Sequence, residues 1–324
     1  MCRLISREVK GKNYYYLEEN IKVKGKWQKE RLYLGNEKPG NKKLLEHFEK
    51  FKKQLSKKGI KVVVPPLTDF ITHVTAVKLN KAIQKKKKFL NKLTAKQKQD
   101  FIKREKITFI TDSNAIEGST LDFEQTNNII NEREKIAWLK KKYVITGSTR
   151  EQEEALSLSK CLDLYEKHLK QKRDLSEELI LQWHYVLLKK IEGYEKYAGV
   201  WRPVNVFIRG SLHRFPHHTE VRNLMIELLK WYEVNKGLIH SVELAAKFHT
   251  KFTTIHPFAD GNGRMARLLM NYILQLNGFP FTNIPLSKRS TYMKTQAAGN
   301  KEKYKPFTKF LVNEIILQNN KLKK

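Results

Sequence analysis

The chain has 324 residues, of which 40% are hydrophobic, with 64 Lys and Arg against 33 Asp and Glu. This length and composition exclude a disordered protein and allow one large domain with an appendage or two ordinary domains. The net charge of +31 favours polyanionic partners such as nucleic acid, nucleotides or an acidic membrane surface, although lysine spread over the whole chain is equally typical of a general compositional bias.

The two cysteines, Cys2 and Cys161, are too far apart in sequence to form a CxxC metal pattern or a disulfide framework. Residues 1–8 lack the apolar segment of a signal peptide, and no apolar run approaches membrane-spanning length. We therefore expect a soluble, cytoplasmic protein without a membrane partner.

The first part of the chain has the pattern of a small sheet. Residues 1 to about 36 alternate like strands, are rich in Lys and Tyr, and contain two turns with glycine. A Lys-rich helix is expected from Leu44 to Lys58, and Pro65-Pro66 marks a boundary. We therefore expect a basic β-meander followed by a helix in this region.

From about Asp69 onward the chain has the pattern of helices. Apolar residues recur at three-to-four spacing beside long polar faces. Gly118 ends one helix, and the capping-box residues from Asp122 to Gln125 start the next. Helices are expected at 74–89, 95–117, about 122–134, 150–170, 176–191, 219–235, 241–255, 262–277, 288–298 and 304–318.

Residues 199–210 depart from the helical pattern. This stretch is β-rich, roughly alternating and bounded by Gly199 and Gly210, which is typical of a short β-hairpin or flap. No neighbouring strand is expected beside it, and an isolated two-stranded ribbon is marginally stable. Another part of the molecule must therefore stabilise it.

The most informative segment is the run His256-Pro257-Phe258-Ala259-Asp260-Gly261-Asn262-Gly263-Arg264-Met265-Ala266-Arg267. Pro257 ends the preceding helix, and the two glycines around Asn262 allow a tight turn. An amphipathic helix follows directly. A Gly-rich turn leading into a helix N-terminus binds anions, and Arg264 and Arg267 suit phosphate groups.

The charges of this segment predict its chemistry. Two cations in the first helical turns oppose the helix dipole unless a polyanion binds there. Asp260 would be repelled by phosphate unless Mg²⁺ bridges the two. His256 lies at the edge of the loop, where it can act as a general base. We therefore expect a Mg²⁺–polyphosphate site with a catalytic histidine.

These twelve residues resemble the Fic family signature H-P-F-x-[D/E]-G-N-G-R-x-x-R without a departure. The resemblance extends over about residues 70–315 and implies a mainly α fold, a Fic-type helical bundle with a β-hairpin flap, here joined to the small N-terminal β-meander. It divides the chain into a basic module at 1–62, a helical part at 66–145 carrying an inhibitory helix, and a catalytic core at 146–324.

The resemblance implies AMPylation, which is the transfer of AMP from ATP to a Tyr, Thr or Ser hydroxyl of a target protein. His256 would take the hydroxyl proton, and Asp260 would hold Mg²⁺ at the phosphates. The α-phosphate would lie at the turn and the β- and γ-phosphates at the two arginines. The nucleotide-binding residues that the resemblance implies are Gly261, Asn262, Gly263, Arg264, Arg267 and Tyr292.

The β-rich stretch resembles the flap of the same family. The resemblance implies that the flap clamps the target segment by strand addition, with Val204, Val206 and Ile208 as the contacting residues. A bound target strand would then supply the pairing that the ribbon lacks.

The stretch Ser113-Asn114-Ala115-Ile116-Glu117-Gly118 ends one of the expected helices. Glu117 is poorly placed at the negative end of the helix dipole, and a cation partner would relieve this. The stretch resembles the family's inhibitory motif [S/T]-x-x-x-E-[G/N]. This implies that Ser113 and Glu117 are inhibitory, with Glu117 pairing with Arg267 and blocking productive γ-phosphate placement. An ordinary exposed glutamate at a helix end is the alternative.

Other functions fit parts of the sequence. A Fic-like loop can also remove AMP or transfer another nucleotidyl or phosphate-containing group, and Glu117 would then position water. A nucleic-acid-binding regulator could be built on residues 1–60, where Tyr14-Tyr15-Tyr16 could stack bases, although a half-buried strand explains these tyrosines without that role. His249 is interpreted as a packing residue. Self-AMPylation and a homodimer are further expectations.

Overall fold

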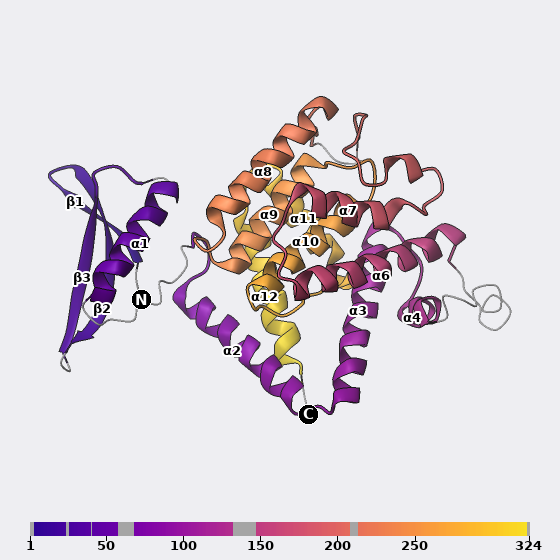
Figure 1. The fold of residues 1–324 in the computed structure, drawn as a ribbon, viewed down its shortest axis with the longest axis horizontal. Helices are drawn as coiled ribbons and strands as arrows, with labels where there is room; N and C mark the ends of the chain where they lie inside the picture. Colours follow the sequence, from indigo (N-terminus) through magenta and orange to yellow (C-terminus); the bar gives the residue numbers. More distant parts are fainter. Residues whose placement is uncertain are drawn as a thin grey trace. The chain divides into compact units, whose positions relative to one another are not determined.

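The structure is a computed structural model, and Figure 1 shows its fold. It describes residues 3–23, 26–39, 41–57, 68–131, 147–207 and 213–322.

Within these ranges the chain forms one three-stranded sheet and eleven α-helices (Figure 1). This confirms the expected mainly α fold with a small N-terminal β-meander. The chain divides into two compact units, Met1–Ile71 with Trp231–Leu244, and Thr72–Lys230 with Ala245–Lys324. The division into three parts expected from the sequence stays a prediction.

The sheet is antiparallel with the strand order β1 (Arg3–Val9), β2 (Lys12–Val23) and β3 (Lys26–Gly35). Helix α1 (Asn41–Lys57) packs against one face of it. The register pairs Leu4 with Leu17 and Leu17 with Leu32, so leucines from all three strands lie on that face. Together with apolar residues of α1 they form a core of Leu17, Leu44, Phe48, Phe51 and Leu55, with Leu4, Leu32 and Leu34 at its edge.

The other helices have nearly the expected bounds. They are α2 (His73–Asn91), α3 (Ala95–Glu117), α4 (Phe123–Asn131), α6 (Thr149–Lys170), α7 (Glu177–Leu188), α8 (Val221–Asn235), α9 (Ser241–Ile255), α10 (Asn262–Leu276), α11 (Arg289–Gly299) and α12 (Lys305–Asn320). Short 3₁₀ turns occupy Glu195–Tyr197, His218–Glu220 and Leu286–Lys288. No described helix is both long enough and apolar enough to span a bilayer.

Local signals explain where α3 and α4 begin and end. A capping box of Thr94 and Gln97 starts α3, and Gly118 ends it with a φ of 114°, a left-handed conformation that suits glycine. The expected capping box before α4 is present, because the side chains of Asp122 and Gln125 each accept a hydrogen bond from the other's backbone N–H. The expected end of this helix, near residue 134, lies outside the described residues.

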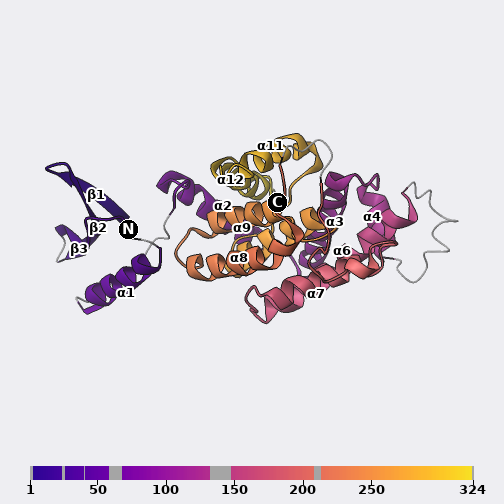
Figure 2. The ribbon, with the colours of Figure 1, turned by 90° about the horizontal axis from the view of Figure 1, so that it is seen from above.

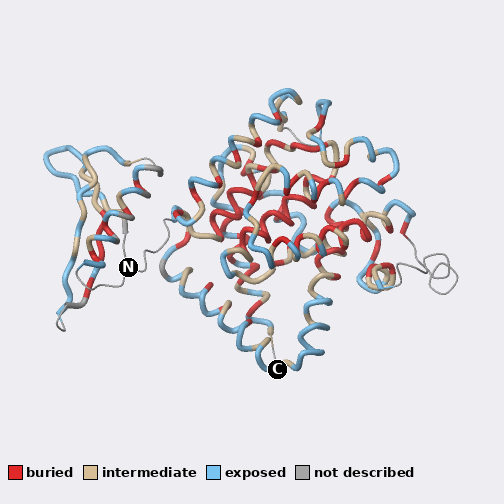
Figure 3. The backbone as a smooth tube through the Cα atoms, in the orientation of Figure 1, coloured by how far each residue is buried: buried red, intermediate tan, exposed pale blue. Residues whose placement is uncertain are grey.

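Helix α10 lies in the middle of the helical bundle (Figure 1), and Figure 2 shows the same bundle from above. Almost all its residues from Asn262 to Leu274 are buried, and it contacts α3 and α6. Figure 3 shows buried residues concentrated around this centre. Because α10 is held on several sides, the loop at its N-terminus has a fixed position.

The expected flap hairpin differs from the described backbone. Residues 203–204 form a bend, residues 201–207 contain no strand, and residues 208–212 lie outside the described part of the chain. The expected strand is therefore absent from residues 201–207, and the hairpin as a whole stays a prediction because its second half lies outside the described residues.

Candidate active site

The loop between α9 and α10 has two residues in left-handed backbone conformations. His256 has a φ of 52°, which is strained for a residue other than glycine, and Gly261 has a φ of 77°. The side chain of Arg202 donates from Nε to the His256 carbonyl at 2.9 Å, and the Arg202 backbone N–H donates to the Pro257 carbonyl at 2.9 Å. These bonds hold the strained residue in place.

The side chain of Asn262 closes the turn internally. Its Oδ1 accepts from the backbone N–H of Phe258 at 2.9 Å, and its Nδ2 donates to the Phe258 carbonyl at 2.8 Å. Asp260 accepts from the N–H of Gly261 at 2.6 Å. Both polar groups of Asn262 therefore shape the loop, and the amides in the first turn of α10 point outward from the helix end.

Asp260 lies among cations from two helices. Its Oδ2 is 3.0 Å from Nη2 of Arg150 and 3.5 Å from Nη2 of Arg264. Arg264 is 2% exposed, and its Nη1 lies 3.5 Å from Glu154. The Nε and Nη1 groups of Arg264 nevertheless have no hydrogen-bond partner among the described residues. A buried guanidinium with unused donors is costly unless a ligand completes its hydrogen bonding.

Arg267, one helical turn further along α10, donates from Nε and Nη2 to residues of α3. It is 1% exposed, and it donates from Nε to Ser113 Oγ at 2.9 Å and from Nη2 to the Ser113 carbonyl at 2.8 Å. Nη2 also donates to Glu117 Oε1 at 2.8 Å. Burial by itself would lower the pKa of Arg267. The negative charge of Glu117 and the contact with Tyr292 raise it by more than burial lowers it, so the side chain stays charged.

The carboxylate of Glu117 also lies directly against the backbone of Gly263. A Cβ atom at this position would collide with Glu117 Oε1 and approach Arg267 Nη1 to 3.1 Å. Glu117 therefore occupies the space in front of the first turn of α10, where the sequence predicted an anion. The side chain of Glu117 is 38% exposed, so solvent can reach its contact with Gly263 and Arg267.

The ring of His256 is held between a backbone carbonyl and an aromatic ring. It hydrogen-bonds to the backbone of Thr253, and its centroid lies 4.4 Å from that of Phe215. Burial is the largest cause that lowers the pKa of His256, the positive charge of Arg202 also lowers it, and the resulting pKa is about 4. At neutral pH one ring nitrogen therefore donates to Thr253 and the other can accept a proton.

Tyr292 is buried and contacts Arg267. It is 2% exposed, it hydrogen-bonds to Arg267, and its hydroxyl lies 3.0 Å from Nε2 of His249. Burial lowers the pKa of His249 well below its usual range. The nucleotide-binding role predicted for Tyr292 stays a prediction, and in the structure its hydroxyl bonds to Arg267 and His249.

The flap residues are only partly described. Val204 is 45% exposed and Val206 is half-buried, while Ile208 lies outside the described residues. The side chain of Arg202 donates to the carbonyls of Val204 and Pro216, at 2.9 and 2.6 Å. Residues 199–210 were expected from the sequence to need stabilisation by another part of the molecule. Arg202 does this for the described part, because it bonds both to this segment and to the His256 backbone.

Sequence reasoning missed several residues that support the loop. His184 stacks on Phe258 with ring centroids 3.5 Å apart, and its Nε2 lies 3.1 Å from the Asp260 carbonyl. Arg289 donates from Nε to the Ile116 carbonyl at 2.8 Å, at the end of α3. The partners in these contacts are mostly backbone groups distant in sequence, which leave no periodic signal along the chain.

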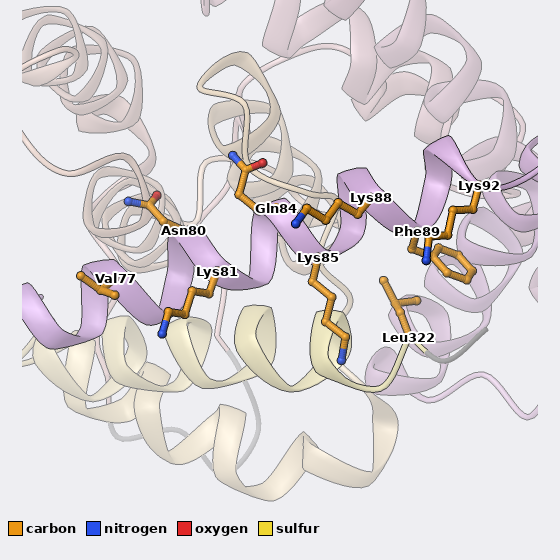
Figure 4. A pocket seen from close by; sticks show the side chains of 9 residues that line it. All are labelled: Val77, Asn80, Lys81, Gln84, Lys85, Lys88, Phe89, Lys92 and Leu322. Atoms are coloured by element: carbon orange, nitrogen blue, oxygen red, sulfur yellow. The ribbon is translucent and has the colours of Figure 1, made fainter.

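A separate groove lies along α2, and Figure 4 shows the side chains that line it. It has a volume of about 640 Å³ and contains none of the predicted site residues. Lys85 Nζ, at this groove, donates to the Asn320 carbonyl at the end of α12 at 2.5 Å. Its lining residues are Val77, Asn80, Lys81, Gln84, Lys85, Lys88, Phe89, Lys92 and Leu322.

The site combines a helix N-terminus with a buried arginine, a carboxylate and a neutral histidine, and helix N-termini and arginines are groups that bind phosphate in many proteins. Residues 174–274 match the model of the Fic/DOC family, and this range contains the whole loop from His256 to Arg267. Residues 174–274 are therefore similar to a Fic domain, and the resemblance seen in the sequence is confirmed for this range.

Known proteins of this kind are similar over part of their length. The chain is 32% identical over 200 residues to the protein adenylyltransferase Fic of Drosophila melanogaster, which covers 61% of this chain and 38% of that protein. The same figures hold for the protein of that name in Drosophila simulans. The aligned region thus spans less than half of these relatives.

Solved structures confirm the fold. A Fic domain-containing signaling protein from Bacteroides thetaiotaomicron superposes with a TM-score of 0.63 and 25% identity, covering 75% of this chain and 94% of that one. Fic-1 from C. elegans gives a TM-score of 0.64 at 24% identity, covering 87% of this chain and 77% of that one.

Proposed function

We propose that this protein is an adenylyltransferase that transfers AMP from ATP to a hydroxyl of a target protein. The observation that carries the proposal is the buried guanidinium of Arg264 beside the N-terminus of α10, whose Nε and Nη1 donors make no hydrogen bond within the described part of the chain. Such a site is suited to phosphate. The name of the Drosophila relatives, protein adenylyltransferase, supports the choice of AMP as the transferred group.

The reaction requires a base at the attacking hydroxyl. We assign this role to His256, because burial lowers its pKa to about 4 and leaves the ring unprotonated at neutral pH. The hydroxyl oxygen forms a bond to the α-phosphorus, and its proton passes to His256. The bond from the α-phosphorus to its bridging oxygen breaks, and pyrophosphate leaves.

We assign the phosphates to the first turns of α10. The amides of Gly263 and Arg264 belong to the helix end that has no partners within the helix, so they can bind the α-phosphate. The guanidinium groups of Arg264 and Arg267 would bind the β- and γ-phosphates. Asn262 contributes by fixing the turn through Phe258.

Asp260 fits the magnesium ion that accompanies ATP. Its carboxylate is ion-paired with two cationic side chains, those of Arg150 and Arg264, so Mg²⁺ would replace at least one of these pairs when it binds together with phosphate. No cluster of three or more His, Cys, Asp or Glu occurs in the described part of the chain. This suits Mg²⁺, which takes one or two carboxylates together with substrate phosphates and would neutralise charge on them.

We propose that Glu117 and Ser113 keep the site in an inhibited state. Their bonds to Arg267 occupy the donors that would bind the γ-phosphate. The Glu117 carboxylate also lies against Gly263, where it would repel an incoming phosphate. Both effects oppose productive ATP binding through the same side chain.

The target hydroxyl belongs to Tyr, Thr or Ser in this proposal, and the target segment docks on the flap at Val204, Val206 and Ile208. The described part of the flap supports an exposed docking segment, because Val204 is 45% and Phe207 is 88% exposed. Self-AMPylation, a homodimer and a cytoplasmic location stay predictions.

The test compares wild type, Glu117→Gly and Glu117→Gly/His256→Ala with labelled ATP, GTP and CTP, reading label on protein. We expect weak labelling of wild type by ATP, at least a tenfold gain in Glu117→Gly, and none in the double variant. Glu124→Gly, at an exposed helix start, is the matched control and should behave as wild type.

The outcomes separate the parts of the proposal. Equal labelling of wild type and Glu117→Gly would remove the inhibitory role and leave the transfer. Labelling by GTP or CTP in preference to ATP would overturn the choice of nucleotide. Labelling that survives His256→Ala would overturn the assigned base.

A further inference from the structure

The sheet of the N-terminal unit has one face covered by α1 and a second face that carries a different set of residues. The register places Tyr16 opposite Tyr33, Glu18 opposite Arg31 and Asn20 opposite Lys29 on this second face. Leu17 and Leu32 alternate with these residues and belong to the core on the α1 side. We call this second face the open face.

Aromatic side chains lie along the open face. Tyr33 is 52% exposed, and its ring lies 5.3 Å from that of Tyr16 and 6.3 Å from that of Tyr14. Trp27, on the same side of β3, is 73% exposed. An aromatic ring that a folded domain leaves this exposed contributes little to its own core, but it can stack with a planar ligand.

The charges of the sheet are separated between its two faces. Among strand residues whose side chains are described, three of the glutamates, Glu8, Glu19 and Glu30, occupy α1-side positions in the register. Glu18, the open-face glutamate among them, is buried and bonded to Arg31 at 2.7 Å.

Most basic side chains show the opposite distribution. Of the basic strand residues whose side chains are described, Arg7, Lys12, Lys29 and Arg31 occupy open-face positions, and Lys26 occupies an α1-side position. The open face therefore combines positive charge with exposed rings, and a general excess of lysine does not explain why the carboxylates are gathered on the other side.

We propose that the open face binds single-stranded nucleic acid. Single strands present phosphates to basic side chains and unpaired bases to aromatic rings, and this is the combination that non-specific single-strand sites use. Duplex DNA has a higher charge density but keeps its bases stacked inside, so it would use only the cations. RNA and DNA single strands share the chemistry that this face recognises.

The test uses the full chain with fluorescein-labelled twenty-nucleotide oligo-dT, oligo-U and a duplex of the same length, and reads fluorescence anisotropy over a salt series. We expect the single strands to bind about tenfold or more tightly than the duplex. Oligo-dT and oligo-U together show whether the site takes DNA, RNA or both. His256→Ala should bind unchanged, which separates this site from the proposed transferase.

Two variants remove the two components separately. In Trp27→Ala/Tyr33→Ala the affinity for the single strands should fall at least about fivefold for each lost stacking contact. The slope of log affinity against log salt should stay unchanged. Arg7→Ala/Lys29→Ala should reduce the slope of log affinity against log salt by about 1.4. All four side chains are exposed, so thermal unfolding should be unaltered.

Matched controls remove the same groups elsewhere. Lys50→Ala/Lys53→Ala deletes two exposed charges on α1 of the same unit, and Tyr185→Ala deletes an aromatic ring that is 50% exposed on α7. Both should bind like wild type. Duplex binding equal to or tighter than single-strand binding would overturn the proposal. So would unchanged affinity in the aromatic variant, equal losses in the controls, or binding only to phosphatidylserine vesicles.

Discussion

At Gly263 the chain has only a hydrogen atom where a side chain would strike the carboxylate of Glu117. The same carboxylate accepts a hydrogen bond from Arg267. Glycine at this position thus permits the closed contact at the start of α10, in addition to any approach of phosphate. The two residues should therefore be coupled energetically.

We predict that Gly263→Ala destabilises the wild-type protein, because the new Cβ displaces Glu117 from Arg267. In the Glu117→Gly background the collision is absent, so the same change should be neutral or stabilising by up to about 1 kcal/mol, as for alanine in place of glycine in a helix. Urea unfolding of the four proteins measures the coupling. Equal effects in both backgrounds would contradict the contact.

The pKa of His256 gives a prediction about pH. Burial lowers it to about 4, so the ring is the unprotonated base at any pH above that value and becomes protonated below it. In Glu117→Gly, kcat/KM should stay nearly constant as the pH falls from 7 to 5 and then drop. The loss of Glu117 removes a charge that raises this pKa, so the drop should not move to higher pH. A half-maximal rate near pH 6.5 would contradict this environment.

At the scale of elements, the C-terminal turn of α3 connects the inhibitory contact to the rest of the bundle. This turn has no basic residue of its own. Arg289, at the start of α11, supplies the cation by donating to the Ile116 carbonyl at 2.8 Å. The position of Glu117 therefore depends on a residue outside its own helix.

We expect Arg289→Ala to loosen the end of α3 and raise basal self-modification by a few-fold, less than Glu117→Gly does. The double variant should modify itself no faster than Glu117→Gly, because no inhibitory contact is left to loosen. Initial rates with labelled ATP provide the measurement. An additive gain in the double variant would show that Arg289 acts by another route.

The helices were predictable from the sequence, and some supporting contacts were not. Helix α9 has the expected bounds from Ser241 to Ile255, because apolar periodicity and its end before Pro257 are both local signals. The ion pair of Glu117 with Arg267 was expected from a motif and is present. The role of Arg202 was not foreseeable, because its partners are backbone carbonyls brought together only by the fold.

At the scale of the whole molecule, buried histidines link stability to pH. Burial lowers the pKa of His184 and of His256 to about 4, and that of His249 well below its usual range. Unfolded histidines bind protons near pH 6.5, whereas these folded ones do so only at lower pH. Between these values the unfolded chain binds more protons, so the free energy of unfolding falls as the pH falls.

The contribution of His184 can be isolated, because its ring is fully buried. Its lowered pKa should cost about 2 kcal/mol of stability between pH 7 and pH 5. The variant His184→Gln should be less stable at pH 7 but lose about that much less on acidification. Urea unfolding at both pH values measures the difference. An identical pH dependence in the two proteins would contradict the buried neutral histidine.

The central claim is that AMP becomes covalently attached to a protein hydroxyl and that pyrophosphate is released. The most direct test incubates Glu117→Gly with ATP and Mg²⁺, with the label on the α-phosphate in one sample and on the γ-phosphate in a parallel one. We predict that protein retains the α-label and not the γ-label, and that His256→Ala in the same background abolishes retention. Retention of the γ-label would identify phosphoryl transfer and contradict the assignment of the α-phosphate to the site beside His256.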